Sequence, residues 1–281
     1  MKRKNNSSWL GNNLAYIPVF FWTLFMGLIF VYIVAASFST PRVIFSGTVF
    51  SFETGFHWEN YKVAWDTQSI GRYFFNSMVY ASIGVLGGAS ISAPAAYVLS
   101  RYKFFGNRLI KRLLILAMSV PSIMLILPIY GVLIKLDFRN SIALCSVYIM
   151  GRVPITTVFL LDFFESISRT YEEAAAIDGA TESKIFLHIM LPMVRPALAT
   201  VSLFGFLALL NEYFISLILI NEKAYRTLAI GLNSVIDALK YNGNYPAIFA
   251  AILLVMLPSL IIFAVFSKKI MYGGLGGGIK G

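Results

Sequence analysis

The sequence has little charge and a single cysteine. Only 13% of its 281 residues are Asp, Glu, Lys or Arg, whereas 58% are hydrophobic and the mean hydropathy is +0.75. Soluble domains carry about 25% charged residues, so this composition excludes an ordinary soluble protein and predicts a membrane protein. Cys145 lies alone in an apolar run, which excludes an internal disulfide and favours a packing role.

Motifs for catalysis, metal binding and nucleotide binding are also missing. The two histidines, His57 and His188, are far apart, and no metal-ligand spacing or convergent nucleophile occurs. No G-x-x-x-x-G-K-[ST] phosphate loop is present, so we expect this chain to hydrolyse no ATP and to bind no cofactor. The net charge of +10 raises the question of nucleic acid, but its basic residues are scattered and form no recognition module.

Long apolar runs predict an all-α membrane protein with six spans, because each run approaches the roughly 20 residues that cross a bilayer. The first run follows the short basic segment 1–13 and is longer than a signal-peptide core, so we expect it to be retained. Polar connections are expected over 38–72 and 221–245, and a flexible tail over 267–281. The predicted spans, which together form one transmembrane domain over 14–266, are residues 14–37, 73–99, 113–134, 142–164, 197–220 and 246–266.

A charged, small-residue segment separates the fourth and fifth predicted spans; residues 165–196 are named the signature loop. Thr170 and Glu173 have the spacing of a capping box and predict a helix start. Gly179 is expected to end this helix in the left-handed conformation. A second helix from Thr181 to Pro192 places four apolar residues on one face, namely Ile185, Phe186, Ile189 and Met190.

The signature loop resembles the loop that marks the membrane subunits of ATP-binding-cassette importers. That pattern is Glu-Ala-Ala, three residues, Gly, nine residues, Ile, one residue and Leu-Pro. The resemblance implies a type I importer permease fold in which this cytoplasmic loop carries the coupling helices and docks on a separate ATPase subunit. The residues expected to couple to the ATPase are Glu172, Glu173, Ala174, Ala175, Asp178, Gly179, Ile189, Leu191 and Pro192.

Weaker matches extend the resemblance to about three quarters of the chain. The segments 95–108 and 227–232, the Asn211-Glu212 pair and the glycine-rich ending are similar to the carbohydrate-uptake branch, and to the smaller six-span permease of the maltose-transporter type. Leu210 departs from that pattern, which often has tryptophan before the Asn-Glu pair. The resemblance implies a sugar or oligosaccharide importer. Its expected partners are a second, different permease, two ATPases that bind ATP and Mg²⁺, and an extracytoplasmic solute-binding protein.

Charge distribution predicts the orientation in a bacterial cytoplasmic membrane. With the signature loop inside, 14 of the 23 Lys and Arg residues fall in inner segments and 8 in outer ones, which favours cytoplasmic N- and C-termini. A non-sugar or acidic solute, such as glycerol phosphate or an acidic oligosaccharide, stays an alternative. A secondary transporter is a remote one, because no internal repeat is visible.

Polar residues inside spans are costly and mark candidate translocation paths. Arg152 lies in the fourth predicted span and Glu212 in the fifth, and we expect them either to pair with each other or to line the path. Five further residues are expected to contact a sugar or to pack between helices: Tyr130, Tyr148, Asn211, Tyr213 and Ser216.

Overall fold

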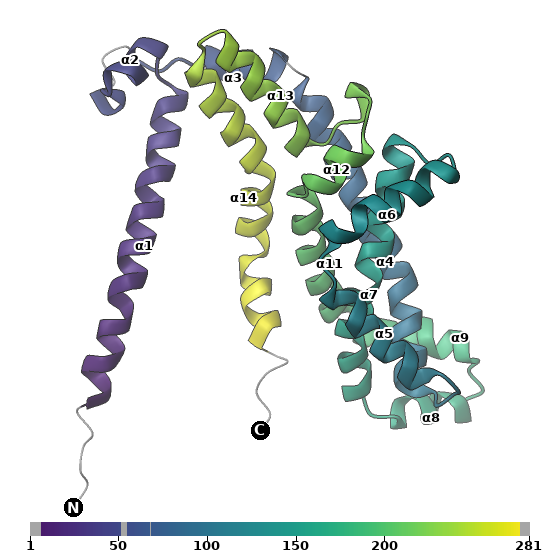
Figure 1. The fold of residues 1–281 in the computed structure, drawn as a ribbon. Helices are drawn as coiled ribbons and strands as arrows, with labels where there is room; N and C mark the ends of the chain where they lie inside the picture. The colour runs from purple at the N-terminus through teal and green to yellow at the C-terminus, as the bar shows by residue number, and fades with distance from the viewer. Residues whose placement is uncertain (1–6, 52–54, 68, 276–281) are drawn as a thin grey trace, which may run out of the picture. The chain divides into compact units, whose positions relative to one another are not determined.

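The computed structural model describes residues 7–51, 55–67 and 69–275, and every regular element among them is a helix (Figure 1). The chain divides into two compact units. One comprises Met1–Ser69 with Leu232–Met256, and the other Ile70–Gly231 with Leu257–Gly281. Four helices are long and apolar enough to cross a membrane, and two bent helix pairs raise the number to six if each pair is one span. The fold thus fits the predicted all-α protein with six spans.

The smaller unit contains the first apolar helix, α1 (Ser7–Ser37), and the connection that follows it. This connection is not irregular, because it forms α2 (Pro41–Ser46), η1 (Val49–Ser51) and α3 (Glu59–Thr67). The Asn60 amide donates to the carbonyls of Ser37 and Ser39, both at 2.9 Å, and ties α3 to the end of α1. The second expected connection likewise contains a long helix, α13 (Leu228–Tyr241), which precedes α14 (Tyr245–Leu275).

The larger unit is built on α4 (Ile70–Arg101) and α7 (Asn140–Ser166), which pack along each other, with α11 (Arg195–Leu210) against both (Figure 1). Small residues on α4 permit this approach, as expected for helices in lipid. A Cβ added to Gly84 would lie 2.8 Å from Cβ of Tyr148 in α7 and 2.7 Å from Cδ1 of Leu209 in α11. Glycine is therefore required where the three helices meet.

Gly84→Leu is expected to disrupt this three-helix contact. Overpacking a tight site lowers the free energy of unfolding by about 1–3 kcal/mol. At Gly84 the nearest atoms include Cβ and the backbone carbon of Tyr148, which cannot move without moving α7. The yield of monodisperse protein after heating in detergent should fall well below that of the wild type. Gly151→Leu on α7 is the control, because a Cβ there meets nothing within 4 Å. Equal losses for both variants would contradict the packing argument.

The third predicted span is bent instead of continuous. α5 (Asn107–Ser119) and α6 (Ser122–Lys135) meet at an angle of 105°. Proline disfavours the helical conformation of the preceding residue, and Val120, which precedes Pro121, has an extended backbone with φ −85° and ψ 121°. The prediction of one continuous span over 113–134 is therefore wrong. It rested on apolar composition, which continues through the bend.

The fifth predicted span is also interrupted. α11 ends at Leu210, residues 211–213 are not helical, and α12 (Phe214–Leu219) follows before the short η3 (Lys223–Tyr225). The helix of the sixth predicted span, α14, continues to Leu275, so the first part of the tail predicted over 267–281 is helical. The last residues of that tail lie outside the described residues. Residues 1–6 of the predicted N-terminal segment lie outside them too.

Candidate functional site

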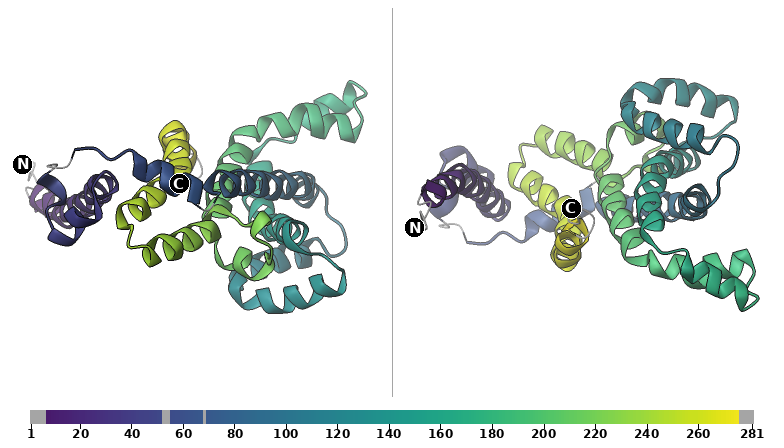
Figure 2. Two further views of the ribbon diagram at one scale, coloured as in Figure 1. Left: turned by 90° about the horizontal axis from the view of Figure 1, so that it is seen from above. Right: turned by 90° about the horizontal axis from the view of Figure 1, so that it is seen from below.

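The signature loop folds into α8 (Thr170–Ile177), α9 (Glu182–Ile185), the π-helical turn η2 (Phe186–Met190) and α10 (Leu191–Met193). Both views of Figure 2 show this segment projecting to the side of the bundled helices of its unit. Helix α10 meets α11 after a bend of 69°. The loop is therefore a structured projection that is continuous with the ends of α7 and α11.

Gly179 ends α8 as predicted. Its φ is +79°, its N–H donates to the Ala176 carbonyl at 3.0 Å, and the N–H of Ala180 donates to the Ala175 carbonyl at 3.0 Å. This pair of bonds is the Schellman motif, which needs a left-handed residue after the helix. The turn between the two loop helices is therefore fixed by a backbone conformation that glycine adopts without strain.

The predicted capping box does not form. Arg169 precedes the first residue of α8, and no side chain caps the helix. The Ser168 hydroxyl instead accepts the Thr170 N–H at 3.3 Å and lies 2.9 Å from the Thr170 hydroxyl. Thr181 does occupy the N-cap position of α9, again without a side-chain bond. The spacing matched the motif, but the helix begins one residue earlier than a Thr170 cap requires.

The π-helical turn η2 ends at Met190, two residues before Pro192. Proline has no N–H, so the carbonyl four residues before it, that of His188, loses its usual partner in an α-helix. A π-helical turn, in which hydrogen bonds join residues five apart, accommodates the missing proline N–H. Such turns recur at functional sites. Of the signature pattern, Ile189 thus lies on the π-helical turn and Leu191 follows it as the first residue of α10, and both are half-buried.

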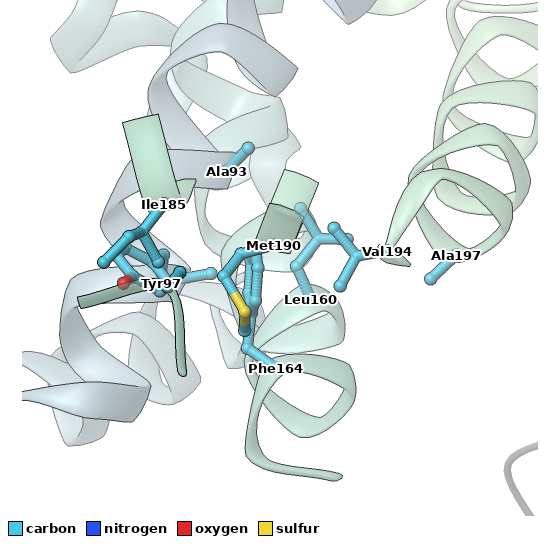
Figure 3. Packing of buried hydrophobic residues seen from close by; sticks show 10 residues of the cluster. Ala93, Tyr97, Leu160, Phe164, Ile185, Met190, Val194 and Ala197 are labelled. Carbon is cyan, nitrogen blue, oxygen red and sulfur yellow. The ribbon is translucent and has the colours of Figure 1, made fainter. Parts of the chain in front are cut away.

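One face of the loop is buried against the unit that carries it. Ile185 and Met190 are 3% and 0% exposed and pack with Tyr97 of α4 and Phe164 of α7 (Figure 3). Phe186 and Ile189 lie at the edge of the same cluster, which confirms the predicted apolar face. The loop is held by tertiary packing, since helices this short are marginal alone.

The opposite face of the loop exposes apolar side chains. Ile177 is 87% exposed, Tyr171 54% and Leu187 53%. Beside them lies a groove of about 600 Å³ lined by Ser168, Thr170, Tyr171, Ala174, Ala175, Asp178 and Ile189. Among the other signature residues, Glu173 and Gly179 are exposed, whereas Glu172 and Pro192 are half-buried. An apolar patch on a projecting loop is typical of a docking surface.

Two of the polar residues predicted within spans, Tyr148 and Ser216, meet at the Glu212 carboxylate. This carboxylate accepts the Tyr148 hydroxyl at 3.0 Å and the Ser216 hydroxyl at 3.0 Å, together with the N–H groups of Ile215 at 2.6 Å and Ser216 at 3.0 Å. A carboxylate at this place caps the first turn of α12. Thr227, which sequence reasoning missed, adds a 3.3 Å bond to the Ser216 hydroxyl.

The expected ion pair between Arg152 and Glu212 does not form. Neither residue enters an ion pair within 4.0 Å in the described part of the chain. The Arg152 guanidinium donates to the Val201 carbonyl at 3.3 Å and lies over Gly205, where a Cβ would be 2.7 Å from Nη2. The Glu212 carboxylate instead accepts bonds from the first turn of α12 and from Tyr148.

The remaining predicted path residues have other surroundings. Tyr130 of α6 and Tyr213 pack at the edge of the apolar cluster that contains Tyr148. The Asn211 amide donates to the Leu207 carbonyl at 2.8 Å and to the Ser259 hydroxyl at 3.4 Å. The structure thus assembles Tyr148, Glu212 and Ser216, places Tyr130 and Tyr213 beside them, and leaves Arg152 and Asn211 apart.

Sequence reasoning missed the contacts between the signature loop and the end of α4. Arg101 forms an ion pair with Glu172, and the Tyr102 hydroxyl donates to Glu182. The bond to Glu182 and partial burial raise the pKa of the Tyr102 phenol, so this group stays protonated and able to donate. Both residues lie in the 95–108 segment that carries a family resemblance, which is the one signal that pointed to them. The described residues contain no group of side chains suited to a metal ion.

Membrane-length helices around α4 and α7, with a projecting loop between the fourth and fifth predicted spans, define a multi-pass membrane protein. Comparison with solved structures agrees. A bacterial ABC transporter that imports the acidic polysaccharide alginate matches with a TM-score of 0.81 at 22% identity, covering 95% of this chain and 99% of that one. Its complex with an alginate-bound periplasmic protein gives a TM-score of 0.68 at 15% identity, covering 94% and 96%.

The chain belongs to the family described as the binding-protein-dependent transport system inner membrane component, whose model matches residues 88–270. Relatives include the diacetylchitobiose uptake system permease protein NgcG of Streptomyces coelicolor, which is 31% identical over 92% of this chain and 85% of its own length. The trehalose/maltose transport system permease protein MalG of Thermococcus litoralis is 30% identical over 90% and 91%.

Proposed function

We propose that this chain is a permease subunit of an ATP-binding-cassette importer for a sugar or oligosaccharide. The observation that carries the proposal is the signature loop, which is ordered on one face by burial and presents exposed apolar residues on the other. The names of NgcG and MalG, which refer to carbohydrate transport, support the substrate class.

In this proposal the signature loop lies in the cytoplasm with both termini, and docks on an ATPase subunit that binds ATP and Mg²⁺. Two such ATPases, a second and different permease and an extracytoplasmic solute-binding protein complete the complex. The excess of Lys and Arg in the inner segments supports the orientation. The segment 221–245 faces the binding protein, and the chain itself supplies no catalytic group and holds no cofactor.

An acidic oligosaccharide is the second candidate substrate. Arg152 supports it, because its guanidinium lies within a span and has no acidic partner within 4.0 Å among the described residues. Arg152 is half-buried and its guanidinium bonds only a neutral carbonyl, that of Val201. A charge within a span is unfavourable without a countercharge, and an anion passing through the pathway would provide one. In this proposal Glu212 serves as a structural residue, because its carboxylate accepts the N–H groups of the first turn of α12.

Stimulation of ATPase activity by solute distinguishes these substrates. The complete complex, reconstituted with its binding protein, is measured against matched neutral and acidic oligosaccharides. Stimulation by a neutral sugar supports the main proposal. Stimulation by acidic sugars alone, lost in Arg152→Gln, supports the second. If neither panel stimulates the ATPase, the solute is not a carbohydrate.

A further inference from the structure

The end of α4 is joined to the signature loop by a buried arginine. Arg101 is the last residue of α4, and its side chain is only 6% exposed. Its Nε donates to Oε1 of Glu172 in α8 at 3.0 Å, and its Nη2 donates to the Ile167 carbonyl at 2.9 Å. The Glu172 side chain is 16% exposed, so the pair is shielded from water and is not an ordinary surface ion pair.

A second arginine makes the reciprocal contact. Arg169 Nη2 donates to the Arg101 carbonyl at 3.1 Å, at the C-terminal end of α4. Ile167, whose carbonyl Arg101 binds, is the residue that follows the last turn of α7. Arg101 therefore binds the carbonyl that follows α7, and Arg169, in the short segment between α7 and α8, binds the last carbonyl of α4. Carbonyls at helix ends lack partners, and positive charge is favourable there. The exchange fixes the ends of α4 and α7 to each other.

Neighbouring contacts extend from α4 to the second helix of the loop. Tyr102 donates its hydroxyl to Glu182 in α9, and the ring of Tyr97 lies 5.2 Å from that of Phe186 in η2. Tyr97 also reaches both sides, because its ring lies 5.6 Å from that of Phe164 in the last turn of α7 and its side chain interacts with Glu172. Arg101 contributes the ion pair to α8 and a hydrogen bond to the carbonyl that follows α7. Lysine cannot replace it, because an ammonium lacks the planar fork that serves two acceptors in fixed directions.

We propose that Arg101 is a positioning residue, which transmits movement of the signature loop to α4 through Glu172 and the Ile167 carbonyl. The chain continues from the loop into α7 and α11 covalently, but α4 is separated from Glu172 by 71 positions and has no such link. Without the Arg101 side chain, the end of α4 loses its ion pair to the loop and keeps apolar packing, the Arg169 bond to its last carbonyl and the bond from Tyr102 to Glu182. The inference rests on the proposed coupling of this loop to an ATPase.

The test measures solute transported per ATP hydrolysed in proteoliposomes that contain the complete complex and its binding protein. Arg101→Gln, Arg101→Lys and Glu172→Gln are compared with wild type and with Lys111→Gln. The control removes a neighbouring but exposed ion pair, between Lys111 and Glu165 at 2.8 Å, whose side chains are 30% and 46% exposed. Mutations along a coupled contact change coupling by about 0.5–2 kcal/mol, a factor of roughly 2 to 30.

We expect Arg101→Gln and Glu172→Gln to lower the transport-to-ATP ratio several-fold while solute-stimulated ATP hydrolysis persists. Arg101→Lys should lower the ratio nearly as much as Arg101→Gln, and Lys111→Gln should leave it unchanged. The double variant Arg101→Gln with Glu172→Gln should be no worse than the poorer of the two single variants. A residue that only stabilises the fold lowers transport and hydrolysis together and leaves their ratio unchanged.

A wild-type ratio in Arg101→Gln, or additive effects in the double variant, would overturn the proposal. If Arg101→Gln does not assemble, Glu172→Gln decides alone, because its amide oxygen still accepts a hydrogen bond while the charge is gone. Failure of the proposed function has a different signature, since the wild-type complex itself then shows no solute-stimulated ATP hydrolysis.

Discussion

Gly179→Val should lower solute uptake at least about tenfold while the chain still reaches the membrane. Gly179 has φ +79° in the Schellman turn between α8 and α9. A left-handed conformation costs a residue with a Cβ about 1–2 kcal/mol, and a β-branched side chain more. Valine therefore shifts the turn and moves the two loop helices apart. At about 1.4 kcal/mol per factor of ten, uptake should fall at least about tenfold.

Uptake of labelled solute at matched membrane levels of the chain measures this effect. Gly179→Asn is the diagnostic companion, because asparagine tolerates the left-handed conformation and should keep much of the activity. Gly47→Val is the matched control, since Gly47 has φ +73° with nothing within 4 Å of an added Cβ but lies outside the signature loop. Asparagine as damaging as valine at position 179 would contradict the conformational explanation.

Glu212→Ala should be the most destabilising substitution among the polar residues of the spans. It removes the acceptor of four hydrogen bonds and leaves the Tyr148 hydroxyl, on a residue that is 2% exposed, without this partner. Hydrogen bonds to a charged group contribute about 1.5–3 kcal/mol each, so losing this group of bonds should cost at least that much. The apparent melting temperature in detergent should fall sharply.

Tyr148→Phe removes only one of these bonds, so its loss should be near 1 kcal/mol. Glu165→Ala is the control, because it removes an exposed carboxylate from an ion pair of small value. If Glu212→Ala melts like the wild type but loses transport, Glu212 serves the pathway and the capping account is wrong.

Features set by short-range chemistry were predictable from the sequence. The six apolar segments, the turn at Gly179 and the buried face of the second loop helix follow from composition, a left-handed glycine and helical spacing. The bend at Val120 was within reach, because Pro121 disfavours a helix at the residue before it. It was missed because the apolar run continues through it.

Features set by long-range contacts were not predictable. Glu212 was expected to seek the opposite charge of Arg152, but the α12 turn two to four residues further along the chain satisfies it first. Arg101 and Glu172 lie in segments whose spacing carries no information about their contact. The short helices of residues 38–72 were missed for the same reason, because bonds such as that from Asn60 to Ser37 stabilise them from outside.

Site-directed cross-linking tests the central claim, that the signature loop docks on an ATPase in the cytoplasm. In a chain with Cys145 replaced by alanine, Ile177→Cys carries a photoreactive maleimide at a position that is 87% exposed, and Tyr241→Cys carries it at one that is 93% exposed. The account predicts an adduct with the ATPase from position 177 only, and labelling of position 241 from outside intact cells. Outside labelling of position 177, or an ATPase adduct from position 241, would contradict it.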